Sequence, residues 1–228
     1  MGKDHLKRIA VPKTWPIERK ASVFVMRTQS GKLQDLSLPL GFVLKEVLGI
    51  CETSRQAVAM LSEKRDSVDG KIRKGRRYPV GLFDVIELID AKKAYRLGLG
   101  PKGKMVAVEI DLAEKDTRIV RISGKSYVKG GKTQFSFLNG RVALLESAKS
   151  YKVGDSILLD ASQKVTKHLP FAKGAYVQFI GGKHIGNFGS IKEIDGQKIV
   201  VESEGNTFET VKRYAFVVGE KKQEVKVA

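Results

Sequence analysis

The densest group of side chains that could do chemistry lies in residues 71–77, where the sequence KIRKGRR holds five cations in seven residues. So many like charges on a short segment are costly unless counterions or phosphate groups neutralise them. The planar guanidinium of arginine can bind phosphate through two parallel hydrogen bonds, so this run could hold a phosphate backbone. The alternative is a solvated basic loop, and the segment by itself leaves both interpretations open.

The positive charge extends well beyond this run. Lys and Arg number 42 and Asp and Glu 25, which gives a net charge of +17. The excess is +5 in each of the segments 1–40, 41–103 and 104–170, and +2 in 171–228. A membrane-surface protein would concentrate its charge on one amphipathic helix, whereas a spread excess suits a long polyanion contacted at many places. The charge therefore favours nucleic acid over a membrane as the partner, with a solvated basic surface as the alternative.

Other motifs lack the context that their chemistry requires. Residues 98–103 match the pattern G-x-G-x-x-G of dinucleotide-binding loops, but they precede a predicted strand instead of a helix, which indicates a β-turn. His5, His168 and His184 lie far apart and have no metal-ligand spacing. The single cysteine, Cys51, is expected to be a buried thiol at a helix end. The sequence nominates no catalytic residue, metal, cofactor or small-molecule substrate.

The composition predicts a soluble, folded protein. Hydrophobic residues make up 42% of the chain, which is enough for a packed core. The longest apolar run among the first thirty residues is 23–26, too short for a signal peptide or a membrane span. The single cysteine fits a reducing cytoplasm.

The N-terminal segment has no sustained periodicity. Residues 1–20 contain Pro12 and Pro16 and several cations around Trp15, the only tryptophan of the chain. We expect this segment to be extended and poorly ordered until it meets a partner. Trp15 would either anchor the segment on its own domain or stack on a nucleic-acid base.

Two helices and a strand pair are predicted next. The first helix runs from near Gly41 to residues 49–51. The second begins at Thr53, which forms a capping box with Gln56. The strand at 66–73 is broken by an Asp-Gly turn, and a further apolar strand covers 85–89. The side chains expected on the buried faces of the two helices are Phe42, Val43, Val47, Leu48 and Ile50 in the first, and Ala57, Val58, Met60 and Leu61 in the second.

Beyond residue 90 short strands predominate. Asn139-Gly140 between two of them predicts a hairpin with a type I′ turn. Five strands after residue 171, with a turn at Asp195-Gly196, predict a small barrel, followed by a frayed basic tail at 220–228. The strands are expected at 93–97, 105–110, 118–122, 134–138, 141–145, 156–160, 176–180, 190–194, 198–202, 207–211 and 216–218.

Two segments resemble known RNA-binding modules. Residues 68–73 and 78–86, behind the two helices, look like the αL motif shared by bacterial small-subunit ribosomal protein four, pseudouridine synthases and tyrosyl-tRNA synthetases. Residues 177–191 look like a KOW motif, a hairpin of SH3-like barrels in ribosomal proteins and transcription elongation factors. With HLKR at 5–8, PKTW at 12–15 and the ending YAFVVG at 214–219, essentially the whole chain resembles the archaeal and eukaryotic family of small-subunit ribosomal protein four. The stop at Ala228 is similar to the archaeal form.

The resemblance implies an α+β multi-domain fold. Residues 1–40 would be a basic extended segment, 41–103 an αL-type RNA-binding domain, 104–170 a central β-rich domain and 171–228 a KOW SH3-like barrel with a basic tail. The protein would be a structural constituent of the small ribosomal subunit in the cytoplasm. It would bind and staple ribosomal RNA beside neighbouring small-subunit proteins, supporting assembly and translation. The alternatives are an RNA-modifying enzyme and a KOW-type transcription factor.

Three groups of residues are expected to contact RNA. The first clamps phosphates, the second lies in the N-terminal segment, and the third lies in the KOW hairpin, whose glycines preserve the backbone shape. Eukaryotic members tend to carry Asn and Arg at two hairpin positions where this chain has His184 and Asn187, which leaves RNA contact by these two open. The phosphate clamp comprises Lys71, Arg73, Lys74, Arg76 and Arg77 with Arg55 and Gln56; the segment contributes Lys7, Arg8, Lys13 and Trp15; the hairpin contributes Lys183, His184 and Asn187 with Gly182, Gly186 and Gly189.

Overall fold

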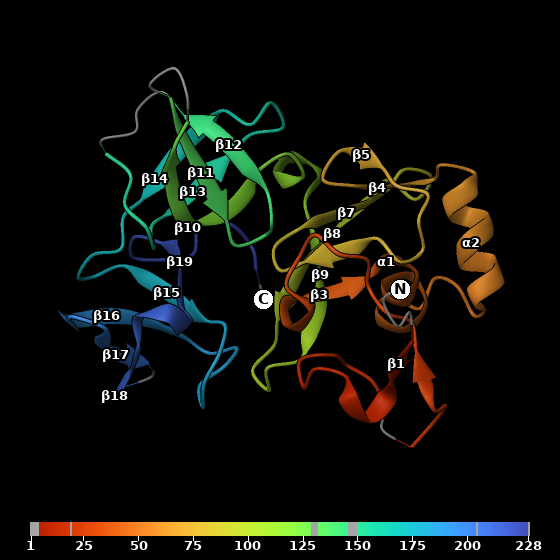
Figure 1. Cartoon of the computed structure of the whole chain (residues 1–228), viewed down its shortest axis with the longest axis horizontal. Coiled ribbons are helices and arrows are strands. Elements are labelled where there is room, and N and C mark those ends of the chain that lie inside the picture. The colour runs from red at the N-terminus through yellow and green to blue at the C-terminus, as the bar shows by residue number, and fades with distance from the viewer. Residues whose placement is uncertain (1–4, 19, 129–131, 146–149, 204, 228) are drawn as a thin grey trace. The chain divides into compact units, whose positions relative to one another are not determined.

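The computed structural model describes residues 5–18, 20–128, 132–145, 150–203 and 205–227. Figure 1 shows a β-rich chain with several sheets and few helices, of which α2 is the longest. The chain forms two compact units. The first comprises Met1–Gly98 and Lys104–Lys115, and the second Leu99–Gly103 and Asp116–Val227. In the described part no helix is long and apolar enough to cross a membrane.

The first predicted helix is confirmed as α1, Leu40–Phe42, which continues into a π-helical turn, Val43–Val47. A π turn takes more residues than an α turn and therefore rotates the side chains that follow. Leu44 is fully buried although the predicted buried face omits it, and Ile50 is 41% exposed although that face includes it. The prediction for Ile50 is wrong because the helix has already ended when the chain reaches it.

Helix α2 spans Ser54–Ser62 and begins with the predicted capping box. The Thr53 hydroxyl accepts from the Gln56 amide at 3.3 Å, and the Gln56 carboxamide oxygen accepts from the Thr53 amide at 2.9 Å. Ala57 and Leu61 are buried one turn apart, whereas Val58 is 39% exposed. Val58 was expected on the buried face. That prediction is wrong because the core covers only a narrow face of α2, the one that carries Ala57 and Leu61.

Three antiparallel sheets belong to the first unit, with strand orders β1-β2, β3-β6 and β5-β4-β7-β8-β9. The predicted Asp69-Gly70 turn joins β4 to β5, and both residues have positive φ, 51° and 68°. Val85, Ala94 and Ile110 form a buried cluster in the largest of these sheets. The strands are β1 Leu6–Lys7, β2 Phe24–Val25, β3 Ser37–Pro39, β4 Asp66–Val68, β5 Lys71–Ile72, β6 Pro79–Gly81, β7 Val85–Leu88, β8 Lys93–Leu99 and β9 Met105–Ile110.

In its described residues, 5–18 and 20, the N-terminal segment packs within the first unit, so the expectation that it needs a partner to become ordered is wrong there. Trp15 has 0% exposed surface, and its ring lies 5.8 Å from that of Phe42. The indole N–H donates to the Gln34 carbonyl at 3.1 Å, and the Met105 amide donates to the Thr14 carbonyl at 2.8 Å. Burial of the large indole offsets the entropy lost on ordering the chain.

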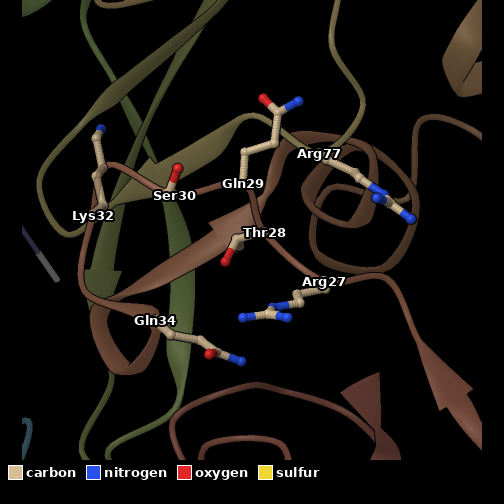
Figure 2. Close-up of a pocket in the computed structure, with 7 residues that line it drawn as sticks. All are labelled: Arg27, Thr28, Gln29, Ser30, Lys32, Gln34 and Arg77. Carbon is tan, nitrogen blue, oxygen red and sulfur yellow. The ribbon is translucent and has the colours of Figure 1, made fainter. Parts of the chain in front are cut away.

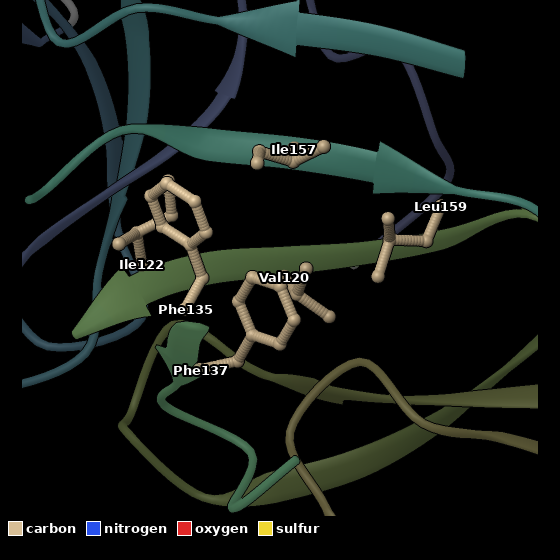
Figure 3. Close-up of a cluster of buried hydrophobic side chains, with 6 residues drawn as sticks. All are labelled: Val120, Ile122, Phe135, Phe137, Ile157 and Leu159. Carbon is tan, nitrogen blue, oxygen red and sulfur yellow. The ribbon is translucent and has the colours of Figure 1, made fainter. Parts of the chain in front are cut away.

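Two five-stranded antiparallel sheets make up the second unit, with orders β12-β11-β10-β13-β14 and β18-β17-β16-β15-β19. Figure 3 shows the core of the first of these, formed by side chains of β10, β11 and β13. Strand β14 has no counterpart in the predicted strands. The strands are β10 Arg118–Tyr127, β11 Thr133–Phe137, β12 Val142–Leu145, β13 Ser156–Leu159, β14 Val165–Leu169, β15 Tyr176–Phe179, β16 Phe188–Asp195, β17 Lys198–Ser203, β18 Asn206–Val211 and β19 Ala215–Gly219.

The hairpin of β11 and β12 is confirmed, but its predicted turn type is wrong. Gly140 has φ +79°, whereas Asn139 is not among the residues with positive φ, and a type I′ turn needs both. The Phe137 amide donates to the Arg141 carbonyl at 2.9 Å, and the Gly140 amide donates to the Phe137 carbonyl at 3.0 Å. These bonds define a three-residue loop that ends in a left-handed glycine.

Two further turns follow the sequence prediction. The Gly103 amide donates to the Gly100 carbonyl at 2.8 Å, so the G-x-G-x-x-G segment is a β-turn between two strands. The chain also turns between β16 and β17 as predicted, although Asp195 still pairs with Lys198 and the two turn residues are Gly196 and Gln197.

The frayed C-terminal tail is not observed in its described part, up to residue 227. Val225 and Val227 are buried, and the Glu224 amide donates to the Val218 carbonyl at 3.1 Å. The Glu224 carboxylate also pairs with the Lys167 ammonium at 2.8 Å. The two apolar side chains in the tail Glu-Val-Lys-Val hold it against the second unit, so the prediction of fraying is wrong.

Candidate nucleic-acid interface

The backbone of the basic loop, residues 71–77, is fixed from behind. The Gly41 amide, in the first turn of α1, donates to the Arg76 carbonyl at 2.8 Å. The Gln29 amide donates to the Arg77 carbonyl at 2.8 Å, and the Tyr78 amide to the Gly75 carbonyl at 2.9 Å. The carbonyls of Gly75, Arg76 and Arg77 therefore accept hydrogen bonds from within the protein. These bonds fix the loop backbone from which the cationic side chains project.

The side chains of this loop differ in exposure. Lys71, Lys74 and Arg76 are exposed, whereas Arg73 and Arg77 are partly buried. The Arg73 guanidinium lies 4.5 Å from the centre of the Tyr78 ring, a cation–π contact that sets its direction. Its Nε is buried without a hydrogen-bond partner among the described residues. The loop thus presents three exposed cations and two partly buried ones, of which Arg73 is oriented by the Tyr78 ring.

Gly41 explains how α1 approaches the loop. A Cβ at this position would lie 3.2 Å from both the Cβ and the carbonyl oxygen of Arg76. A larger residue would require the loop to shift by a few tenths of an ångström, so Gly41 lets α1 pack directly against the loop.

A polar pocket adjoins the loop and was not found by the sequence reasoning. Its volume is about 610 Å³, and it shares Arg77 with the loop. Figure 2 shows the Arg27 guanidinium pointing toward the Gln34 carboxamide with the Thr28 hydroxyl nearby, while the Lys32 ammonium points away from them. No periodic pattern marks these positions, because six of them lie in one irregular segment. The lining residues are Arg27, Thr28, Gln29, Ser30, Lys32, Gln34 and Arg77.

Lys32 fastens one wall of the pocket to the sheet. Its ammonium forms an ion pair with the buried Asp84 carboxylate, which also accepts from the Gly81 amide at 2.7 Å. The pKa of Asp84 is raised to about 6, mainly by burial and also by the neighbouring Asp69, although Lys32 and the Gly81 amide act to lower it. The ion pair stabilises the charged carboxylate, so the Lys32 charge is used within the protein.

The start of α2 holds two of the residues expected in the phosphate clamp. Arg55 is exposed. The Gln56 carboxamide oxygen accepts from the Glu52 and Thr53 amides, both at 2.9 Å. That oxygen is therefore occupied by helix capping, which gives Gln56 a structural role in the first turn.

In the N-terminal segment, some of the residues expected to contact RNA are exposed, and others are used in contacts within the chain. Lys7 and Lys13 are exposed. The Arg8 guanidinium donates to the carbonyl of Glu18 and to the carbonyl and hydroxyl of Ser22, the last at 2.8 Å. The Trp15 ring has no exposed surface for stacking on a base, so of its two interpretations the anchor is the one observed.

The side chains of the expected KOW hairpin lie in the second unit. Lys183 is exposed at the tip of the loop before β16. The His184 ring stacks on that of Phe208 with centroids 3.8 Å apart, and Asn187 donates its backbone amide to the His184 carbonyl at 3.1 Å. The buried Gln178 carboxamide donates to the Leu99 carbonyl at 2.9 Å and to the Gly186 carbonyl of the loop at 3.4 Å.

Backbone conformation and close packing explain why glycine occupies three positions of this hairpin. Gly182 and Gly186 have φ of +83° and +88°, a region that side chains avoid. A Cβ on Gly186 would overlap the Gly100 carbonyl, and one on Gly189 would lie 2.6 Å from Val201 Cγ1. The backbone shape expected from the sequence therefore depends on these positions.

The comparisons with known proteins agree with one another. A model described as Ribosomal family S4e matches residues 91–165, and a model described as the RS4NT domain matches residues 1–31. Small ribosomal subunit protein eS4 of Methanosphaera stadtmanae is 38% identical, covering 97% of this chain and 94% of that protein. The same protein of Archaeoglobus fulgidus is 35% identical, with 95% and 94% covered.

A solved structure supports the fold. The crystal structure of 30S ribosomal protein S4e from Thermoplasma acidophilum matches with a TM-score of 0.67 at 24% identity, covering 81% of this chain and 95% of that one. The relatives are named as ribosomal proteins and not as enzymes, which confirms the expected non-enzymatic family. The chain belongs to the S4e family of small-subunit ribosomal proteins.

Proposed function

We propose that this protein is a structural component of the small ribosomal subunit that binds ribosomal RNA by clamping its phosphates with the loop 71–77. One observation carries the proposal: backbone hydrogen bonds from Gln29 and Gly41 fix the loop, while Lys71, Lys74 and Arg76 remain exposed. Family membership supports the ribosomal setting.

Physical chemistry favours phosphates over bases as the target of this loop. The major groove of A-form RNA is too narrow for side chains, so double-stranded RNA is recognised by shape and backbone contacts. A loop with a fixed backbone loses less conformational entropy on binding than a mobile one. Arg73, oriented by the Tyr78 ring, and the partly buried Arg77 would bind phosphate with the fork geometry, and the exposed cations would add long-range attraction.

Other exposed cations extend the proposed contact to both units. Arg55, Lys7, Lys13 and Lys183 would contact neighbouring phosphates, and the stacked His184 with Asn187 would shape the hairpin at Lys183. We assign Trp15, Arg8 and Gln56 to folding, because their polar or ring surfaces are used inside the chain. RNA contacts from both units would staple separate segments of ribosomal RNA.

The domain layout belongs to the same proposal. The boundaries near 40, 103 and 170 would separate the extended segment, the αL-type module, the central sheet and a barrel. The strand order β18-β17-β16-β15-β19 supports an SH3-like barrel in which the outer strands close on each other. On the ribosome, in the cytoplasm, the exposed faces would meet neighbouring small-subunit proteins.

The test is salt-dependent binding of the full chain to small-subunit ribosomal RNA. Lys74→Ala with Arg76→Ala removes two exposed charges from the loop. Lys221→Ala with Lys222→Ala removes two exposed charges from the C-terminal tail and is the matched control. The loop variant should lose affinity and reduce the slope of log affinity against log salt by roughly 1 to 2 units. Equal effects of the two variants would contradict the clamp.

A further inference from the structure

We propose that three cations of the second unit, Lys152, Lys212 and Arg213, form a binding site for the phosphate backbone of ribosomal RNA, in addition to the loop 71–77. These three residues are called the basic patch below. The inference rests on the proposed RNA-binding function and adds a second place of contact to it. The site follows from how two segments, far apart in the sequence, are fixed against one strand.

The turn that carries two of these cations is held by an arginine of the other sheet in the second unit. This 3₁₀ turn spans Lys212–Tyr214, between β18 and β19. The Arg121 guanidinium, from β10, donates to the Arg213 carbonyl at 2.8 Å and to the Lys212 carbonyl at 3.4 Å. The Lys212 amide donates to the Gln197 carbonyl at 2.8 Å. These three hydrogen bonds fix the backbone from which the two cationic side chains project.

The loop that carries the third cation lies against the same strand and the same turn. The Gly154 amide donates to the Ile122 carbonyl at 3.0 Å, and the Ile122 amide donates to the Asp155 carbonyl at 2.9 Å. A Cβ on Gly154, which has φ +104°, would lie 3.6 Å from Lys212 Cε. Lys152 lies two residues before this contact and is exposed. The three cations therefore belong to one region of the surface.

The charge of the basic patch is not matched by carboxylates. Among the described residues, no carboxylate forms an ion pair with Lys152, Lys212 or Arg213. The Lys212 ammonium lies 4.9 Å from the centre of the Phe171 ring, a cation–π contact that leaves its positive charge in place. Burial lowers the pKa of the Arg121 guanidinium, and no carboxylate in the described part of the chain acts against that shift. The potential at the patch therefore favours an anionic ligand.

Asp155, the acidic residue nearest to Lys152 in the sequence of the loop, is used within the chain. Its side chain is 4% exposed. Oδ2 accepts from the Lys152 amide at 2.9 Å and lies 2.9 Å from His168 Nε2. Oδ1 accepts from the Phe171 amide at 2.9 Å. The carboxylate thus orders the backbone of the loop, while the Lys152 ammonium stays available to a ligand.

A phosphodiester backbone fits this arrangement. Its phosphate oxygens can accept two parallel hydrogen bonds from the Arg213 guanidinium, while the ammonium groups of Lys152 and Lys212 act as point charges beside it. Because the turn and the loop are already fixed, binding orders little more than the three side chains. An acidic protein segment carries the same sign of charge, but the excess of +17 over the whole chain favours a long polyanion such as RNA.

Binding of the full chain to small-subunit ribosomal RNA at several salt concentrations tests the proposal. Lys152→Ala with Arg213→Ala removes two exposed charges of the basic patch, and Lys221→Ala with Lys222→Ala is again the matched control. We expect the patch variant to lose affinity about tenfold and to reduce the slope of log affinity against log salt by roughly 1 to 2 units. The control should change affinity by about twofold or less. Equal effects of the two variants would overturn the proposal.

Arg121 acts as a positioning residue, and Arg121→Lys tests that role. The substitution keeps the charge but loses the planar fork that reaches the carbonyls of both Lys212 and Arg213. Binding is measured at a temperature at which circular dichroism shows the variant to be fully folded. We expect RNA affinity to fall about threefold, because the turn must then be ordered on binding. Unchanged affinity together with a lower thermal midpoint would restrict Arg121 to a structural role.

Chemical protection reports occupancy of the basic patch directly. Phenylglyoxal modifies exposed arginines, an acylating reagent modifies exposed lysines, and mass spectrometry of peptides assigns each modified residue. Ribosomal RNA should protect Arg213 and Lys152 and leave Lys221 and Lys222 reactive. Inorganic phosphate and polyglutamate, at the same concentration of negative charge, are the comparison probes. Protection by either probe equal to that by RNA would overturn the RNA assignment.

The two proposals fail in distinguishable ways. If the wild-type chain does not bind small-subunit ribosomal RNA, the proposed function is wrong. If the chain binds this RNA and Lys74 of the loop is protected while Arg213 and Lys152 stay reactive, only the assignment of the basic patch is wrong.

Discussion

Trp15 gives the sharpest test of how the N-terminal segment is held. Its ring has 0% exposed surface, packs against Phe42, and donates to the Gln34 carbonyl at 3.1 Å. Truncating a buried tryptophan to alanine typically costs about 3–5 kcal/mol. Since whole domains are stable by about 5–15 kcal/mol, Trp15→Ala should remove a large fraction of the stability of the first unit.

A second variant separates the ring from its hydrogen bond. Trp15→Phe keeps an aromatic ring beside Phe42 but removes the indole donor, and the Gln34 carbonyl then accepts from the Ser37 amide alone. Loss of one hydrogen bond costs about 0.5–1.5 kcal/mol, so this variant should fall between wild type and Trp15→Ala. Urea unfolding followed by circular dichroism measures the free energy of unfolding for all three proteins.

The same residue also provides a direct optical assay. Trp15 is the only tryptophan in the chain, so fluorescence of the RNA-free protein reports on this one site. The structure predicts blue-shifted emission and weak quenching by acrylamide. Emission typical of a water-exposed indole, together with a loss of less than about 1 kcal/mol in the free energy of unfolding for Trp15→Ala, would refute the docking of the segment.

Three further predictions concern stability. Burial, with a smaller effect of Asp90, raises the pKa of Asp66 from its ordinary 3.8 to about 6, and its carboxylate oxygens are buried without a hydrogen-bond partner in the described part of the chain. The folded state therefore holds this proton more tightly than the unfolded state, and wild-type stability should fall as the pH rises between about 4 and 6. Asp66→Asn should lack that part of the fall and be more stable by about 2 kcal/mol near neutral pH, and a urea midpoint lower than that of wild type there would contradict this. Gln56→Ala should cost about 1 kcal/mol in urea unfolding through loss of the capping box while leaving the salt slope of RNA binding unchanged; a reduced slope would return Gln56 to the phosphate clamp. Gly186→Ala should lower the thermal midpoint of the second unit, because the new Cβ meets a carbonyl at positive φ, and an unchanged midpoint would show that the loop relaxes freely.

Local patterns predicted the strands and turns well where one short signal determines the outcome. The Asp69-Gly70 turn and the capping box at Thr53 are examples, since each depends on residues only a few positions apart. The turn at Asn139 was predicted with the wrong type. Asn-Gly permits a type I′ turn, but the pairing of Phe137 with Arg141 imposes a loop one residue longer.

Errors arose where tertiary contacts decide the outcome. Pro12, Pro16 and scattered cations left anchoring and base stacking both open for Trp15, because its partners lie in a later segment. The tail held by Val225 was expected to fray for the same reason: two apolar residues among charges form no periodic pattern. In both cases the burial of a few apolar side chains overcomes a polar local sequence.

The candidate site was predictable only in part. The basic loop 71–77 was evident from charge density, and Lys71, Lys74 and Arg76 are exposed, while its contact with phosphate stays a prediction. The pocket was not, since Thr28, Ser30 and Gln34 are ordinary loop residues until the fold brings Arg77 beside them. The composition of a segment is enough to locate a charged loop, whereas a pocket can be recognised only once the path of the folded chain is known.

The most direct test of the central claim is sedimentation of cell lysate through sucrose gradients at low and high salt, with detection of this chain. We expect the protein to migrate with small ribosomal subunits and with complete ribosomes, and to remain with them at high salt. Restriction to the light fractions, or release by a modest rise in salt, would contradict its assignment as an integral RNA-binding component of the subunit.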